Sequence, residues 1–235
     1  MFGQIPPTPY DLRFRAFGVP VRVHPVFWLT AAFLAWGGSN GDLRLVLIRV
    51  LCIFVAILVH ELGHALVTRH FGWQPEIVLY FFGGYATSAR HSTFKDMAVS
   101  AAGPAAGFGL LFAIWMSIPV LAQFDLLQER LLLDALDFSL FINLLWNIVN
   151  LLPVLPLDGG HISRELCCWL APRKGMQISL GISTAIAGAV ALWCLLGQMS
   201  VRIILGLDPL FLGIMFGYLA YQSYQAFESA RRGYW

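Results

Sequence analysis

A pair of histidines inside an apolar stretch constrains this chain more than any other feature of its sequence. His60, Glu61 and His64 fall within residues 43–67, which are otherwise almost wholly apolar. On a helix, residues four apart face the same way, so both imidazoles can bind one metal ion. Glu61 lies next to them and can take a proton from an attacking water molecule. Ionisable groups are costly inside a lipid bilayer, so their presence in such a stretch indicates a function.

A structural role for the histidine pair is the competing interpretation. The pattern His-Glu-x-x-His occurs by chance in about one chain in a hundred of this length. In a soluble helix, a buried or surface histidine pair would need no further explanation. In an apolar helix nothing solvates three ionisable side chains within five residues, and this favours a metal site.

The composition is typical of a polytopic membrane protein. The 235 residues are 58% hydrophobic and 12% charged, against about 25% charged residues in a typical soluble domain. The net charge of +2 and the lack of a Lys/Arg run exclude nucleic acid as a partner. The four cysteines form neither a disulfide framework nor a C-x-x-C motif, so we expect them to serve in packing. They are Cys52, Cys167, Cys168 and Cys194.

The apolar segments predict an all-α polytopic membrane protein with about six transmembrane helices. The expected spans are residues 23–36, 43–67, 97–121, 138–157, 178–196 and 210–226. Residues 1–20 lack the features of a signal peptide, and we expect them to form a cytoplasmic, amphipathic lead-in. Residues 163–177 are expected to be a polar and basic connection.

A short β-hairpin is expected after the second span. Residues 76–82 and 85–89 are rich in β-branched, aromatic and small residues, and Gly83 and Gly84 lie between them as the turn. A hairpin at membrane depth needs protein or water to satisfy its backbone. We therefore expect it to dip into the membrane beside the active site and to offer an unpaired edge.

A second motif, in residues 150–161, contains a candidate for a third metal ligand. Two prolines interrupt the end of the fourth span, and Asp158 follows them in a flexible glycine turn. A zinc site with two histidines needs a third protein ligand. Asp158 is the best candidate and His161 its rival. In a different membrane zincin the third ligand would be a glutamate on a following helix, for which Glu76 and Glu165 are the only close candidates.

Three asparagines of the fourth span form a candidate substrate-binding face. Asn143, Asn147 and Asn150 are spaced four and three residues apart, which places them on one side of a helix. They must point into the helix bundle. Binding of the substrate backbone and joining of helices explain the spacing equally well.

The distribution of Lys and Arg predicts an orientation in the membrane. With a cytoplasmic N-terminus, eleven Lys and Arg residues fall on the cytoplasmic side and four on the other. Both termini are then cytoplasmic. The C-terminal ends of the second and fourth spans share the cytoplasmic half of the bilayer, where His60, His64 and Asp158 can meet.

The two motifs together resemble those of the site-2 proteases, the intramembrane zinc metalloproteases of peptidase family M50. Residues 60–64 are similar to the first family motif and residues 150–160 to the second. The similarity extends over about residues 20–165, including residues 21–25, 81–84 and 102–104. It points to the six-span branch, and we expect neither a PDZ domain between the motifs nor a CBS pair.

The resemblance implies a function and a set of site residues. His60, His64 and Asp158 would bind one zinc ion per chain, and Glu61 would act as the general base. The substrate would be a single-span membrane protein, cut in or near its transmembrane segment, in the cell (inner) membrane. One integral-membrane domain over residues 1–235 would comprise a catalytic core of about 20–165 and accessory helices of about 177–226.

The expected substrate-binding residues combine the hairpin with the asparagine face: Gly83, Gly84, Asn143, Asn147 and Asn150. An inactive zinc-binding membrane protein and a metal transporter are the alternatives to an enzyme. A transporter needs a polar path across the bilayer, and the half opposite the histidines lacks comparable polar residues. No feature of the sequence indicates an oligomeric state.

Overall fold

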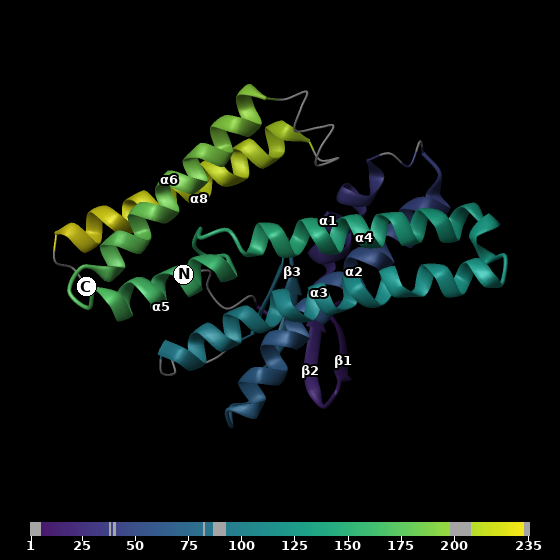
Figure 1. Ribbon diagram of the computed structural model, residues 1–235, viewed down its shortest axis with the longest axis horizontal. Coiled ribbons are helices and arrows are strands. Elements are labelled where there is room, and N and C mark those ends of the chain that lie inside the picture. Colours follow the sequence, from purple (N-terminus) through teal and green to yellow (C-terminus); the bar gives the residue numbers. More distant parts are fainter. Residues whose placement is uncertain are drawn as a thin grey trace. The chain divides into compact units, whose positions relative to one another are not determined.

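The computed structural model describes residues 6–37, 39, 41–81, 83–86, 93–197 and 208–232, which fold mainly into helices (Figure 1). They belong to two compact units. Unit 1 comprises Met1–Ala89 and Ala105–Leu144, and unit 2 comprises Arg90–Pro104 and Leu145–Trp235. Two of the long helices therefore contribute to both units.

Unit 1 contains a four-stranded sheet with the strand order β1-β2-β3-β4. β1 (Leu12–Ala16) and β2 (Val19–Val23) form an antiparallel hairpin, β2 pairs in parallel with β3 (Ile77–Tyr80), and β3 pairs antiparallel with β4 (Gly83–Ala86). The lead-in expected over residues 1–20 contains β1 and the start of β2, and these strands were not predicted from the sequence. Leu12–Ala16 alternates apolar and charged residues, the period of a half-buried strand, and Gly18 with φ 79° permits the tight turn.

The hairpin expected over residues 76–89 is confirmed for its described residues, with its turn two residues earlier than predicted. Tyr80 pairs with Gly83 and Leu79 with Gly84, so both glycines lie within β4. Residues 82 and 87–89 lie outside the described part of the chain. β3 is paired on both sides, and the unpaired edge expected of this hairpin therefore belongs to β4.

Helices α1 (Pro25–Trp36) and α2 (Leu43–His70) pack on each other and on the sheet. Their shared core is fully buried and includes Phe27 of α1, Ile53 of α2 and Leu79 of β3. α1 begins at Pro25 because His24 caps it: the His24 Nδ1 atom accepts a hydrogen bond from the Val26 N–H at 3.2 Å. This cap explains the histidine that precedes the first apolar helix.

The next helices are α3 (Thr93–Gln123), the 3-10 turn η1 (Leu126–Gln128) and α4 (Arg130–Asn150). α4 begins eight residues earlier than the expected span of 138–157 and ends seven residues earlier. It starts early because its charged first turns are accommodated by an ion pair between Asp134 and Arg49 of α2. It ends at Asn150 because Pro153 and Pro156 cannot continue a helix.

Besides the start of α3 and the end of α4, unit 2 contains α5 (Asp158–Leu170), α6 (Gly175–Leu196) and α8 (Pro209–Arg231). α6 and α8 lie side by side (Figure 1). A polar connection is expected at residues 163–177, but residues 163–170 of this stretch are helical and belong to α5. Only one face of this short helix is apolar, so it lacks the continuous hydrophobic run by which the longer helices are recognised.

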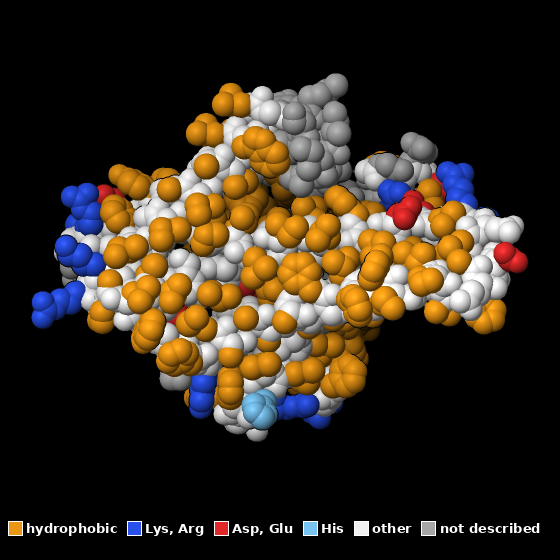
Figure 2. Space-filling model, in the orientation of Figure 1, with side chains coloured by type: hydrophobic (Ala, Val, Ile, Leu, Met, Phe, Trp, Pro, Cys, Tyr) orange, Lys and Arg blue, Asp and Glu red, His pale blue; other side chains and the backbone are white. Residues whose placement is uncertain are grey.

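Four described helices are long and apolar enough to cross a membrane by length and composition, namely α2, α3, α4 and α6. α1 is apolar but has only 12 residues. Hydrophobic side chains cover much of the surface visible in Figure 2. Exposed large hydrophobic residues of the helices include Phe33, Phe112 and Trp115. A surface of this kind is matched by lipid rather than water, so the chain is an integral membrane protein.

Candidate metal centre

The two motif histidines converge on one point within α2. The Nε2 atoms of His60 and His64 are 3.2 Å apart, and their rings meet nearly edge to face at 80° with centroids 4.8 Å apart. His60 is 2% exposed, Glu61 5% and His64 8%. Helical geometry alone produces this convergence, because the two side chains lie one above the other on adjacent turns.

The spacing of the two nitrogen atoms fits a tetrahedral metal ion. Bonds from zinc to imidazole nitrogen are about 2.0–2.1 Å long, and two such bonds at a tetrahedral angle hold the nitrogens about 3.3 Å apart. The observed separation of 3.2 Å agrees with that value. Two buried imidazoles at this distance therefore make a suitable half of a zinc donor set.

Polar contacts near both ends of α2 fix its position in unit 1. Near the N-terminal end, the Arg49 guanidinium donates to both carboxylate oxygens of Asp134, at 2.9 and 2.5 Å, and to the Gly37 carbonyl at 2.7 Å. Near the C-terminal end, Arg69 donates to the carbonyl of Phe17 in the β1–β2 turn. The helix that carries the histidines is thus tied to α4 and to the sheet.

Asp158 is the first residue of α5 and is half-buried. The flexible glycine turn expected around it is wrong, because Gly159 and Gly160 are buried in the first turn of this helix. A Cβ atom at Gly159 would overlap the Leu151 carbonyl, and one at Gly160 would lie 2.5 Å from the Val154 carbonyl carbon. The glycines therefore permit close packing of the preceding segment and fix the place of Asp158.

The rival ligands lie in different surroundings. His161 is half-buried in α5, three residues after Asp158. The Glu76 carboxylate is 3.8 Å from the Arg22 guanidinium, and the Glu165 carboxylate accepts hydrogen bonds of 2.8 and 3.0 Å from Arg164. Both glutamates are thus engaged by arginines, which leaves them poorly suited to bind a metal ion.

The asparagine face lies on α4, with Asn143 in unit 1 and Asn147 and Asn150 in unit 2. Asn143 and Asn147 are buried and Asn150 is half-buried. The side-chain amide of Asn143 donates to the Ser139 carbonyl at 2.8 Å, and that of Asn150 donates to the Trp146 carbonyl at 2.9 Å. The side-chain N–H groups of Asn143 and Asn150 are thus bonded within α4.

Comparisons with known proteins agree with the motifs. The sequence profile described as Peptidase family M50 matches residues 120–194. Stage IV sporulation protein FB of Bacillus subtilis is 32% identical over 169 residues, which are 68% of this chain and 54% of that protein. Zinc metalloprotease MJ0392 of Methanocaldococcus jannaschii is 31% identical over 208 residues, 86% of this chain and 58% of the relative. The chain thus spans about half the length of these curated relatives.

A solved structure resembles the whole described fold. The site-2 protease from Methanocaldococcus jannaschii superposes with a TM-score of 0.60 at 25% sequence identity, and the match covers 93% of this chain and 95% of that one. Sequence profile, relatives and fold therefore agree with the resemblance that the two motifs carry. This chain belongs to peptidase family M50, the family of the site-2 proteases.

Proposed function

We propose that this chain is an intramembrane zinc metalloprotease that hydrolyses a peptide bond in or near a transmembrane segment of a membrane-protein substrate. The observation that carries this proposal is the convergence of the His60 and His64 Nε2 atoms, 3.2 Å apart, within an apolar helix. Membership of a peptidase family and a relative named as a zinc metalloprotease support zinc as the metal and proteolysis as the reaction.

The proposed zinc ligands are His60, His64 and Asp158, with one ion per chain. Asp158 is favoured as the third ligand because it occupies the position of the second family motif and is held by tight packing at the start of α5. A carboxylate oxygen and two imidazoles are a common donor set for catalytic zinc, which leaves one position open for substrate. When bound, zinc supplies a Lewis acid that polarises the scissile carbonyl.

Glu61 is the proposed general base. Its carboxylate is buried beside His60 on α2, where it takes a proton from the attacking water molecule and passes it to the leaving amine. The side-chain amides of Asn143, Asn147 and Asn150 are proposed to bind the substrate backbone. Gly83 and Gly84 are proposed to serve the same purpose through the backbone of β4, since a β-strand edge can accept an extended peptide as a further strand.

The proposed placement in the membrane follows the distribution of charge. α2, α3, α4 and α6 are apolar and long enough to cross a membrane, and α1 and α8 are proposed to complete six spans in the cell (inner) membrane. Both termini lie in the cytoplasm and the zinc site lies in the cytoplasmic half of the bilayer. Residues 1–235 act as one integral-membrane domain, with a catalytic core of about 20–165 and accessory helices of about 177–226.

Zinc content and cleavage, measured side by side, test this proposal. In detergent-purified protein we expect one zinc ion per chain, a sharp loss of zinc in Asp158→Asn, and full zinc retention in Glu61→Gln. Cleavage of a panel of single-span reporter proteins should fall about 10²- to 10⁴-fold in Glu61→Gln, because only proton transfer is removed. If Glu61→Gln and the wild type contain equal amounts of zinc, the lower cleavage rate reflects the loss of proton transfer and not the loss of the metal.

Three other results would contradict the proposal. A wild-type protein without zinc under metal-replete conditions would remove the site. Cleavage that persists in Glu61→Gln would show that another residue is the general base. Zinc retained in Asp158→Asn would make His161 the next ligand to test.

A further inference from the structure

We propose that Ser183 of α6 and Ser223 of α8 are positioning residues for Asp158. Their hydroxyls hold the segment Leu151–Leu157, which ends at the residue before Asp158. This inference rests on the proposed function, because it takes Asp158 to be a zinc ligand. It assigns a task to α6 and α8, the helices that lie outside both family motifs.

The hydroxyl pair is fully engaged and buried. The Leu155 backbone N–H donates to the Ser183 Oγ atom at 2.8 Å, and the Oγ atoms of Ser183 and Ser223 are 2.8 Å apart. Ser183 is 0% exposed and Ser223 3% exposed. A hydroxyl has one proton and two lone pairs, so Ser183 can accept from Leu155 and also hydrogen-bond to Ser223. One irregular segment is thereby fastened to two helices at once.

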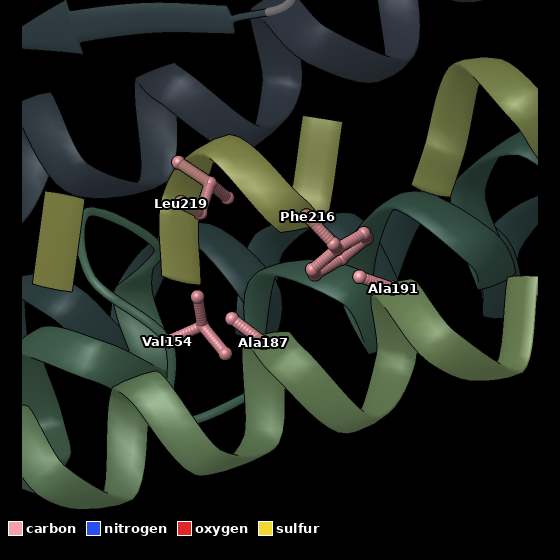
Figure 3. Packing of buried hydrophobic residues seen from close by; sticks show 5 residues of the cluster. All are labelled: Val154, Ala187, Ala191, Phe216 and Leu219. Atoms are coloured by element: carbon pink, nitrogen blue, oxygen red, sulfur yellow. The ribbon is translucent and has the colours of Figure 1, made fainter. Parts of the chain in front are cut away.

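An apolar contact fastens the same segment one residue earlier. Figure 3 shows the Val154 side chain among Ala187 and Ala191 of α6 and Phe216 and Leu219 of α8, and all five are buried. The small side chain of Ala187 lies next to the valine (Figure 3). Val154 and Leu155 therefore hold the segment by packing and by hydrogen bonding at adjacent positions.

The anchored segment is stiff up to Asp158. The Leu157 N–H donates to the Val154 carbonyl at 2.8 Å, and Pro156 between them has its φ fixed by its ring. The Leu157 carbonyl in turn accepts from the His161 N–H at 3.1 Å, the first hydrogen bond of the α5 region. With so little rotational freedom over three residues, displacement of Leu155 also displaces the backbone of Asp158.

A second buried serine on α6 provides a control that distinguishes a positioning role of Ser183 from a role in packing. Ser179 lies one turn before Ser183, is 1% exposed, and its Oγ atom has no hydrogen-bond partner among the described residues. Loss of this hydroxyl removes a buried polar atom without touching the segment. Ser179→Ala is therefore the matched control for Ser183→Ala.

The experiment measures zinc binding and metal geometry in the full chain in detergent. Ser183→Ala, Ser223→Ala and Ser179→Ala are titrated with a chelator to obtain the zinc dissociation constant, and reloaded with Co²⁺ to record the visible absorption of the metal site. We expect the zinc dissociation constant of Ser183→Ala to rise about tenfold, as for other groups that orient metal ligands. Its cobalt spectrum should change, whereas Ser179→Ala should match the wild type in both readings.

Ser223→Ala keeps the acceptor for Leu155 and should show a smaller change in the same direction. If Ser183→Ala does not fold, Ser223→Ala alone tests whether the serine pair positions Asp158. The inference is overturned if both serine-pair variants keep the wild-type dissociation constant and spectrum, or if Ser179→Ala is affected as strongly as they are. In either case Asp158→Asn would still lose zinc, and the proposed function would stand. Zinc retained in Asp158→Asn would show that Asp158 is not a zinc ligand, and this inference would fail with that assignment.

Discussion

Asp11 illustrates how a single buried carboxylate outside the membrane helices is kept ionised. Its side chain has no exposed surface, and it accepts hydrogen bonds from the Thr8 backbone N–H at 2.9 Å, the Thr8 hydroxyl at 2.5 Å and Arg22 at 3.0 Å. Burial raises the pKa of this carboxyl, but the hydrogen bonds from Thr8 and the charge of Arg22 outweigh burial and lower the pKa from 3.8 to about 2.

The depressed pKa of Asp11 makes the stability of unit 1 depend on acidity. Because the folded pKa lies below the unfolded value, the ionised carboxylate contributes stability above pH 3.8, and this contribution is lost as the pH falls toward about 2. A pKa shift of this size corresponds to about 2.5 kcal/mol. Asp11→Asn should therefore lower the unfolding midpoint in detergent at pH 7 and have almost no effect near pH 2. An equal loss at both pH values, or an equal loss in the exposed control Asp137→Asn, would contradict this assignment.

The convergence of His60 and His64 could be predicted from the sequence because helix geometry fixes residues four apart. The role of Gly159 and Gly160 could not, because a glycine pair signals either a turn or close packing, and only the carbonyls of Leu151 and Val154 decide between them. Nothing in the sequence indicates the role of Ser183. Its partners lie 28 and 40 residues away, and a serine in an apolar helix does not indicate where its hydroxyl bonds.

At the scale of elements, long hydrophobic runs identified α2, α3 and α6 to within a few residues at their ends. Elements stabilised mainly by tertiary contacts were missed. The β1–β2 hairpin depends on β3, which follows more than fifty residues later and completes the sheet in parallel. α5 and the first turns of α4 are short or charged, and their helical state depends on partners that hydrophobic periodicity does not reveal.

The free edge of β4 leads to a prediction about substrate binding. β1 and β4 are the two edges of the described sheet, and β4 lies next to the strand that packs on α1 and α2. If a substrate adds to β4, Tyr85→Cys in a Glu61→Gln background should form disulfides with single cysteines along an uncut reporter. Their yield should alternate with a period of two residues, because alternate side chains of a strand face opposite sides.

Leu12→Cys on the opposite edge is the control for this experiment, since Leu12 is exposed on β1. Cross-linking from β4 with strict alternation, and little from β1, is the expected pattern. Equal yields from both edges, or yields without periodicity, would show that the substrate does not extend this sheet at β4.

At the scale of the whole molecule, the orientation in the membrane is open to direct measurement. Arg15 and Arg130 are exposed and lie on opposite sides in the proposed topology. In a background with the four native cysteines replaced by alanine, Arg130→Cys should react with a membrane-impermeant maleimide in intact cells. Arg15→Cys should react only after the membrane is permeabilised. The reverse pattern would place the zinc site in the other half of the bilayer.

The ion pair between Arg49 and Asp134 has a consequence for the synthesis of the chain. The two residues are 85 positions apart, and Arg49 is near the start of the apolar helix α2. At about 5–20 residues per second, the ribosome makes the cation roughly 4–17 s before the carboxylate. During that interval the arginine is without this partner, and a charged side chain in a membrane helix is costly when it is unpaired. Assembly of α2 with α4 is thus the step of biogenesis at which this charge is neutralised.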